Sequence, residues 1–255
     1  KNWRADWLEH GLNLNICTLA EYDPYFEKES RVKVAYKTNP HDDNLLYQWK
    51  NLTQNKTYAL IGESVKSAHV CYFIRGRRED VKDKIEFRKI IPSHSVSEGV
   101  KSDTDFYLFP EMRNKEITKE VLNLINSTDH NLIICNLAST DMIGHCLPEK
   151  YEEAKLAYRS VEKSICSMVE VAKINNIPII ITSDHGNIED HDSSHSANEI
   201  LTTIILDKKT KLSHFPARLY DIGPTILEIF GIKNPTKNKL NRDKKFLGKS
   251  MIEFT

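Results

Sequence analysis

The sequence predicts an α/β fold with a mostly parallel central sheet, helices on both faces of that sheet, and a remnant of a second α/β domain in front of it. From residue 131 onward, short apolar runs alternate with a helical pattern, which is typical of a parallel sheet covered by helices. Polar residues follow directly where these runs end. Residues 1–40 differ, because they contain strand patterns but no complete strand–helix unit.

The strands and the long helix of the main domain follow from the spacing of apolar residues. Apolar runs at 131–138, 177–182 and 200–206 predict strands, and we expect a further core strand at 68–73. Between the first two of these runs, apolar residues recur every three or four positions, which predicts a long helix with one buried stripe. The stripe consists of Ala154, Ala157, Tyr158, Val161, Ile165, Met168, Val169 and Ala172.

A shorter helix is expected near the carboxyl end of the chain. It begins at 221–225, where Pro224 suits the first helical turn, and it ends at Gly231. At the other end, we expect two strands at 15–19 and 32–35.

The domain organisation is predicted from the change in pattern after residue 40. We assign 1–40 to the remnant of the second domain, 41–52 to a hinge that follows Pro40, and 53–255 to the main domain. There is no internal repeat and no low-complexity tract.

Composition excludes several classes of function. The chain has 36 basic and 36 acidic residues, so its zero formal charge gives no bulk field for nucleic acid or an anionic membrane. Its five cysteines form no Cys-x-x-Cys pair, which argues against a disulfide framework and favours a reducing compartment. No secretory signal and no apolar run of membrane-spanning length is visible. We therefore expect a cytoplasmic protein without nucleic acid or membrane as a partner.

Carboxylates and imidazoles gather at one edge of the predicted sheet. Asp141 and His145 follow the first predicted strand, Asp184 and His185 follow the second, and His195 lies in the loop before the third. The carboxyl ends of parallel strands share one edge, where ligands collect. Aspartate and histidine are suitable ligands for manganese, magnesium or zinc. The sequence therefore predicts a divalent-metal site at this edge.

Each of these motifs also has a simpler interpretation when it is taken alone. Asp184 could cap a turn in which Gly186 adopts a positive φ. His191 and His195 could be solvated loop residues. The recurrence of the same residue types at one sheet edge favours the metal site over these alternatives.

The motifs resemble those of the cofactor-independent phosphoglycerate mutases, which belong to the alkaline phosphatase superfamily. The resemblance runs in order through nearly the whole chain and implies an alkaline-phosphatase-like fold. The similar segments are 2–6, 63–70, 110–112, 136–145, 182–187, 194–198 and 221–225.

The resemblance implies a pair of metal sites. Asp141, His145 and His195 would hold one divalent ion, and Asp184 and His185 would hold part of the other. Manganese is the expected metal, with magnesium, cobalt and zinc as alternatives, and no 2,3-bisphosphoglycerate is needed.

The resemblance also implies two residues that bind the substrate, phosphoglycerate. Lys66 would contact the phosphoryl group as a catalytic residue, because a positive charge there stabilises the charge of the transition state. Arg4 would bind the substrate, since its guanidinium offers a bidentate fork to phosphate or carboxylate. The alternatives are an exposed strand-end lysine and a frayed terminal arginine.

The family's mechanism needs parts for which this sequence has no matching motif. A nucleophilic serine and a further metal-ligand aspartate would come from an amino-terminal segment, supplied in cis or in trans. By this resemblance, 1–40 is the tail of the substrate-binding domain and 53–255 is an incomplete phosphatase-like domain. We expect the chain alone to be inactive as a mutase and the complete protein to be a monomer.

Some positions depart from the family pattern and leave other functions open. Trp7 stands where a second arginine is usual, and Arg77 lies in a stretch that is usually glycine-rich. The alternatives are a related metal-dependent phosphatase or phosphopentomutase, and an inactive metal-binding pseudoenzyme that serves as an interaction module. A fragment, a nicked half and a degenerate paralogue all remain compatible with the sequence.

Overall fold

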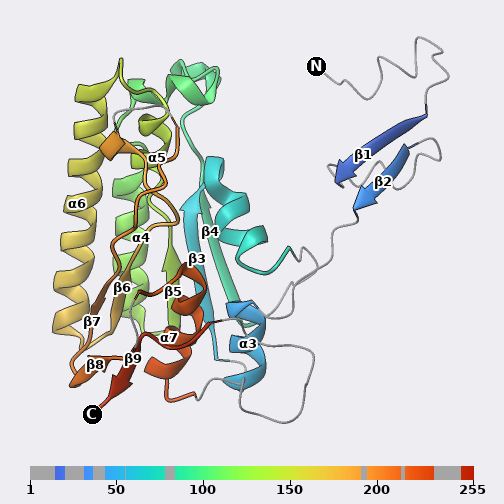
Figure 1. The fold of residues 1–255 in the computed structure, drawn as a ribbon. Coiled ribbons are helices and arrows are strands. Elements are labelled where there is room, and N and C mark those ends of the chain that lie inside the picture. The colour runs from blue at the N-terminus through green and yellow to red at the C-terminus, as the bar shows by residue number, and fades with distance from the viewer. Residues whose placement is uncertain are drawn as a thin grey trace. The chain divides into compact units, whose positions relative to one another are not determined.

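The structure, a computed structural model, falls into two compact units (Figure 1), Lys1–His41 and Asp42–Thr255. It describes residues 15–20, 32–36, 44–54, 56–77, 84–190, 194–213, 216–232 and 248–255. In the first unit, β1 (Ile16–Ala20) and β2 (Val32–Tyr36) pair in parallel, which confirms the two strands predicted there. Arg4, Trp7 and His191 lie outside the described residues.

The second unit contains both strands and helices. Its helices are α3 (Leu45–Leu52), α4 (Asn114–Ser127), α5 (Ser139–Gly144), α6 (Tyr151–Ile174) and α7 (Ile222–Ile229). Its strands are β3 (Tyr58–Glu63), β4 (Glu86–Ile91), β5 (Leu132–Cys135), β6 (Ile179–Ile181), β7 (Thr203–Ile205), β8 (Thr210–Leu212) and β9 (Ile252–Phe254). None of the helices in the described ranges is both long and apolar enough to cross a membrane.

Strand β3 is the centre of the main sheet, because it pairs in parallel with β4 on one side and with β5 on the other. All six of its residues are buried. Tyr58 and Leu60 pack with residues of α3 and α7, whereas Ala59 and Ile61 pack with α4 and α6. Side chains alternate between the two faces of a strand, so β3 holds one helical layer on each face. The predicted fold class is confirmed.

The predicted core strand at 68–73 is wrong. The chain leaves β3 through a 3-10 turn, Ser64–Lys66, and then forms a π-helix over Ala68–Phe73. The adjacent residues Val70 and Cys71 are both buried, which fits one side of a helix rather than the alternating faces of a strand, whereas Phe73 is 50% exposed. The strand lies ten residues upstream, in β3.

Helix α6 confirms the predicted long helix, and its buried residues include Ala154, Ala157, Met168 and Ala172. Tyr158 departs from the predicted stripe, since it is 59% exposed. Strands β5 and β6 occupy parts of the predicted runs at 131–138 and 177–182.

Strand β7 occupies the third predicted run, but it pairs antiparallel with β6. The end of β6 therefore lies beside the start of β7. A hydrogen bond between the hydroxyls of Thr182 and Thr202, with an oxygen–oxygen distance of 2.9 Å, joins the two ends of the connecting loop. The two ends of this loop therefore lie side by side.

Part of the segment predicted as a hinge is helical. Helix α3 begins after Asn44, whose side chain accepts a hydrogen bond from the amide of Tyr47, and it buries Leu46 and Trp49. The apolar face of α3 explains the difference, because it packs in the same core as β3 and α7. The assignment of 1–40 and 53–255 to separate domains stays a prediction.

Helix α7 begins and ends as predicted, with Pro224 in its first turn and Gly231 beyond its last residue at φ +72°. Buried Asp221 precedes the helix and accepts hydrogen bonds from the amides of Arg218 and Lys249 at 2.8 Å each. One carboxylate thus joins the start of α7 to the segment before β9.

Candidate metal centre

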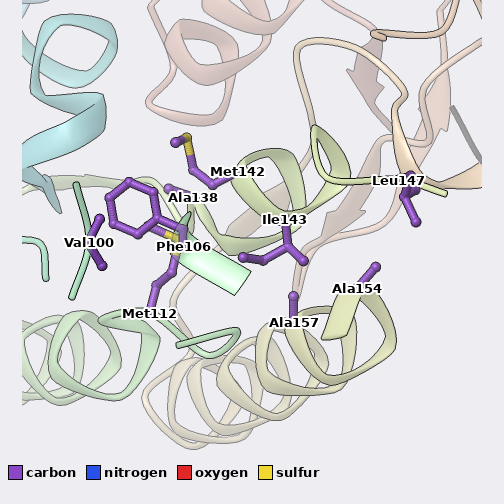
Figure 2. Close-up of a cluster of buried hydrophobic side chains, with 9 residues drawn as sticks. All are labelled: Val100, Phe106, Met112, Ala138, Met142, Ile143, Leu147, Ala154 and Ala157. Atoms are coloured by element: carbon purple, nitrogen blue, oxygen red, sulfur yellow. The ribbon is translucent and has the colours of Figure 1, made fainter. Parts of the chain in front are cut away.

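The short helix α5 positions the first candidate ligand. It follows β5, and it packs in a cluster of buried apolar side chains (Figure 2). Met142 and Ile143 lie in this cluster, with exposures of 3% and 0%. On the other side of the helix, the side chains of Asp141 and His145, one helical turn apart, lie within 3.3 Å of each other. The core therefore fixes the place of Asp141.

Three imidazoles surround one oxygen of Asp141. Its Oδ1 lies 3.3 Å from the Nε2 atoms of His145 and His195, and 3.7 Å from the Nε2 of His185. The structure therefore brings together the three residues predicted for the first ion, and it adds His185 to them. Their assignment as metal ligands stays a prediction.

The three rings also lie against one another. His185 stacks on His195 with a centroid distance of 3.6 Å, and the Nε2 atoms of His145 and His195 are 3.1 Å apart. Two ring nitrogens at this separation cannot both carry a proton directed at the other, so at least one presents a lone pair.

The donor set fits a divalent metal. Ligand atoms from Asp141, His185 and His195 all lie within 4.8 Å of one another, and no other group of this kind occurs in the described part of the chain. A carboxylate oxygen and neutral imidazole nitrogens are ligands that zinc and manganese accept.

Asp184 lies beside this cluster and is exposed to solvent. Its side chain is 71% exposed, and its Oδ1 is 3.6 Å from the Nε2 of His185. The Nδ1 of the same His185 ring is 3.1 Å from the backbone oxygen of Gly186. His185 is therefore close both to Asp141, which is predicted for the first ion, and to Asp184, which is predicted for the second. The resemblance assigns these two ligand sets to different ions, whereas the geometry places them side by side.

Lys66 lies on the opposite side of Asp141 from the histidines. Its Nζ is 2.6 Å from Oδ2 of Asp141, and the two side chains are only 19% and 18% exposed. Burial raises the pKa of Asp141, but the hydrogen bond and the charge of Lys66 outweigh it, so the pKa lies below its usual range. Lys66 is therefore not an exposed strand-end lysine.

Asn187 is a site residue that the sequence reasoning did not single out. Its side-chain amide donates to Oδ1 of Asp141 at 3.1 Å and to the backbone oxygen of Asp141 at 3.3 Å. Gly144 makes this approach possible, because a Cβ there would overlap the Asn187 amide. The available signal was the position of Asn187 in the motif that begins at Asp184.

Comparison with known protein families identifies the class of protein. Residues 12–234 match the metalloenzyme superfamily, so the chain belongs to that superfamily.

Named relatives then give the particular resemblance. The 2,3-bisphosphoglycerate-independent phosphoglycerate mutase of Francisella tularensis subsp. novicida (strain U112) is 30% identical over an alignment of 251 residues that covers 95% of this chain and 44% of that protein. The protein of the same name from Clostridium tetani (strain Massachusetts / E88) is 33% identical over an alignment of 233 residues that covers 88% of this chain and 42% of that protein. The resemblance predicted from the motifs is confirmed.

A solved structure supports the fold. The phosphoglycerate mutase of Leishmania mexicana, determined at low cobalt concentration, aligns with a TM-score of 0.72 and 19% sequence identity. The match covers 94% of this chain and 44% of the Leishmania protein. The chain therefore spans less than half the length of the relatives and of the solved structure that it matches.

Proposed function

We propose that this chain is the metal-binding, phosphatase-like part of a cofactor-independent phosphoglycerate mutase. The complete enzyme would interconvert 3-phosphoglycerate and 2-phosphoglycerate in glycolysis and gluconeogenesis, in the cytoplasm and as a monomer. The observation that carries the proposal is the placement of Lys66 and three histidines around Asp141. The names of the relatives support the substrate.

We propose that the complete site binds two divalent ions of unequal affinity. We assign the tighter site to Asp141, His145 and His195, and part of the second site to Asp184 and His185. Manganese is the proposed metal. A bound divalent ion would polarise the phosphoryl oxygens and stabilise the negative charge that develops on them.

The residues of this chain would hold and orient the phosphoryl group. The positively charged Nζ of Lys66 lies beside Asp141. It would pair with a phosphoryl oxygen as well as with Asp141. Arg4 would bind the glycerate or its phosphate through a bidentate fork.

The serine that accepts the phosphoryl group would come from a further segment, either in cis or in trans. Two observations support such a segment. The relatives are more than twice as long as the part that aligns with this chain. In the Francisella protein, the aligned part is 44% of the length. Within the described residues, β5 is hydrogen-bonded only to β3 and β6 only to β7, and both apolar strands are half-buried. An added strand could bury them further.

The test is a coupled assay with 3-phosphoglycerate and manganese. The purified chain should produce no 2-phosphoglycerate above the level of a His145→Ala control, because a nucleophile positioned for attack is needed. The amino-terminal half of a relative, supplied as a second polypeptide, should restore turnover after verified assembly. Continued silence of the assembled protein would favour the pseudoenzyme, and release of inorganic phosphate alone would favour a phosphatase.

A further inference from the structure

We propose that Glu189 is a positioning residue of the metal centre, and that its carboxylate closes the loop between β6 and β7 so that Asn187 and His195 meet Asp141. The proposal rests on the metal site of the proposed function, but it needs no mutase activity. Glu189 lies in a 3-10 turn, Ile188–Asp190, and has no role in the motifs considered above.

The Glu189 carboxylate joins the two arms of the loop. On the first arm, Oε2 accepts a hydrogen bond from the backbone amide of Asn187 at 2.9 Å. On the second arm, Oε1 accepts from the hydroxyl of Ser196 at 2.5 Å and from the side-chain amide of Asn198 at 3.4 Å. A single side chain thus connects segments that are seven and more residues apart.

The two arms are also in direct backbone contact at this level. Gly186 and Ser196 form an antiparallel bridge, with the Ser196 amide donating to the Gly186 oxygen at 2.8 Å. A Cβ at Gly186 would overlap both the Glu189 carboxylate and the Ser196 hydroxyl. Gly186 does not have a positive φ. Space for the carboxylate, rather than a left-handed turn, therefore explains the glycine.

Each arm that Glu189 holds leads directly to the metal centre. Asn187 donates to Oδ1 of Asp141, and Ser196 immediately follows His195, whose Nε2 is 3.3 Å from the same oxygen. Release of the clamp would leave both arms free to separate from Asp141. Glu189 itself makes no hydrogen bond or ion pair with these candidate ligands among its described contacts, so it would act through Asn187 and Ser196.

The charge of Glu189 suits a permanent clamp. The hydrogen bond from Ser196, together with backbone hydrogen bonds, lowers the pKa of Glu189 to about 2. The carboxylate is therefore ionised across the range in which histidines can bind a metal, and its charge-assisted hydrogen bonds stay formed.

The experiment compares Glu189→Ala with Asp190→Asn in the full 255-residue chain. Asp190 is a matched control, because it is the neighbouring acid and its side chain accepts from the same Asn198 side chain at 2.8 Å. Its only described contact with Asn187 is made by the backbone amide, at 3.4 Å, which the substitution to Asn retains. Calorimetric titration with Mn²⁺ should show binding weakened about 10- to 100-fold in Glu189→Ala, the range typical of residues that orient metal ligands. Asp190→Asn should stay within about threefold, as expected for a surface change.

A second measurement needs no metal. In the metal-free chain, the ring proton resonances of His145, His185 and His195 should shift in Glu189→Ala and stay in place in Asp190→Asn. Unmoved resonances, or Mn²⁺ affinity within twofold of the unmodified chain, would overturn the clamp. If Asp141→Ala abolishes Mn²⁺ binding while Glu189→Ala does not, only the clamp fails. If the unmodified chain binds no Mn²⁺, the metal site fails, and the resonances still decide the clamp.

Discussion

Asp141 and Asp184 are both aspartates that follow a strand of the same unit, yet their surroundings differ. Asp141 lies on helix α5 above a packed core, its side chain is 18% exposed, and it contacts Lys66, Asn187 and histidines. Asp184 lies in an irregular loop, its side chain is 71% exposed, and its Oδ1 lies 3.6 Å from the Nε2 of His185. One carboxylate is held in place by the fold, whereas the other depends on what binds beside it.

The difference teaches that a strand-end position alone does not make a preorganised ligand. A carboxylate held by neighbours does not lose rotamer freedom on binding, while an exposed one must be ordered when the metal arrives. We therefore expect the two aspartates to contribute unequally to metal affinity.

The largest expected effect is that of Asp141→Ala. This change removes the oxygen around which His145, His185 and His195 are arranged, so Mn²⁺ affinity should fall by at least about a hundredfold. The fold should persist, since the apolar core under α5 is untouched. Calorimetric titration and circular dichroism measure the two effects. An unfolded variant, or one with unchanged affinity, would remove the basis of the comparison.

Asp184→Ala should have a smaller effect. The tighter site should keep its affinity within about threefold, as for a surface substitution, and only a weaker second binding event should disappear. The same titration checks this, with Asp141→Ala as the reference. Two equally tight sites in the unmodified chain would contradict the inequality between the aspartates.

Lys66→Met should change the metal affinity in the opposite direction, which sharpens the account of Asp141. Removing the cation beside Asp141 should raise Mn²⁺ affinity severalfold, because about 1 kcal/mol of charge repulsion at the site would be lost. A decrease in affinity would mean that Lys66 holds Asp141 in its binding position.

The same variant should change how stability depends on pH. The folded pKa of Asp141 lies below its unfolded value, so the Lys66 pair stabilises the metal-free fold above the ordinary aspartate pKa of about 3.9 and is lost as pH falls through the lowered folded pKa. Thermal unfolding from pH 7 to pH 3 should therefore show a loss that is smaller in Lys66→Met by at most about 1 kcal/mol, because one carboxyl contributes about 1.4 kcal/mol for each pH unit below its unfolded pKa. Equal losses would mean that the pair contributes nothing.

Much of the fold was accessible from sequence because strong patterns coincide with real elements. The stripe through Ala154 and Met168 predicts α6, and the apolar runs predict β5 and β6. The strand prediction for 68–73 failed because a short run of mostly apolar residues fits a strand and a helix equally well, and only packing decides between them. The antiparallel direction of β7 is likewise a property of pairing rather than of local sequence.

The candidate ligands could be predicted from the sequence for the same reason, but the residues that position them could not. The candidate ligands are aspartates and histidines, which are common metal ligands, and they lie next to predicted strands. Four of them follow a strand, and His195 precedes one. Asn187 and Glu189 act through hydrogen bonds to partners up to 46 residues away, and no spacing rule identifies such partners. His185 lies among the ligands predicted for the first ion because its ring stacks on that of His195, and local sequence does not indicate this contact.

The loop between β6 and β7 starts and finishes at the same place, at the hydrogen-bonded pair Thr182 and Thr202. Three of the five candidate ligands sit on it, together with Glu189 and Asn187. A loop with adjacent ends can be lengthened, shortened or replaced as a cassette at little entropic cost to the sheet that carries it. Evolution or a protein engineer could therefore retune metal preference by exchanging this single loop, while α5 continues to present Asp141 unchanged.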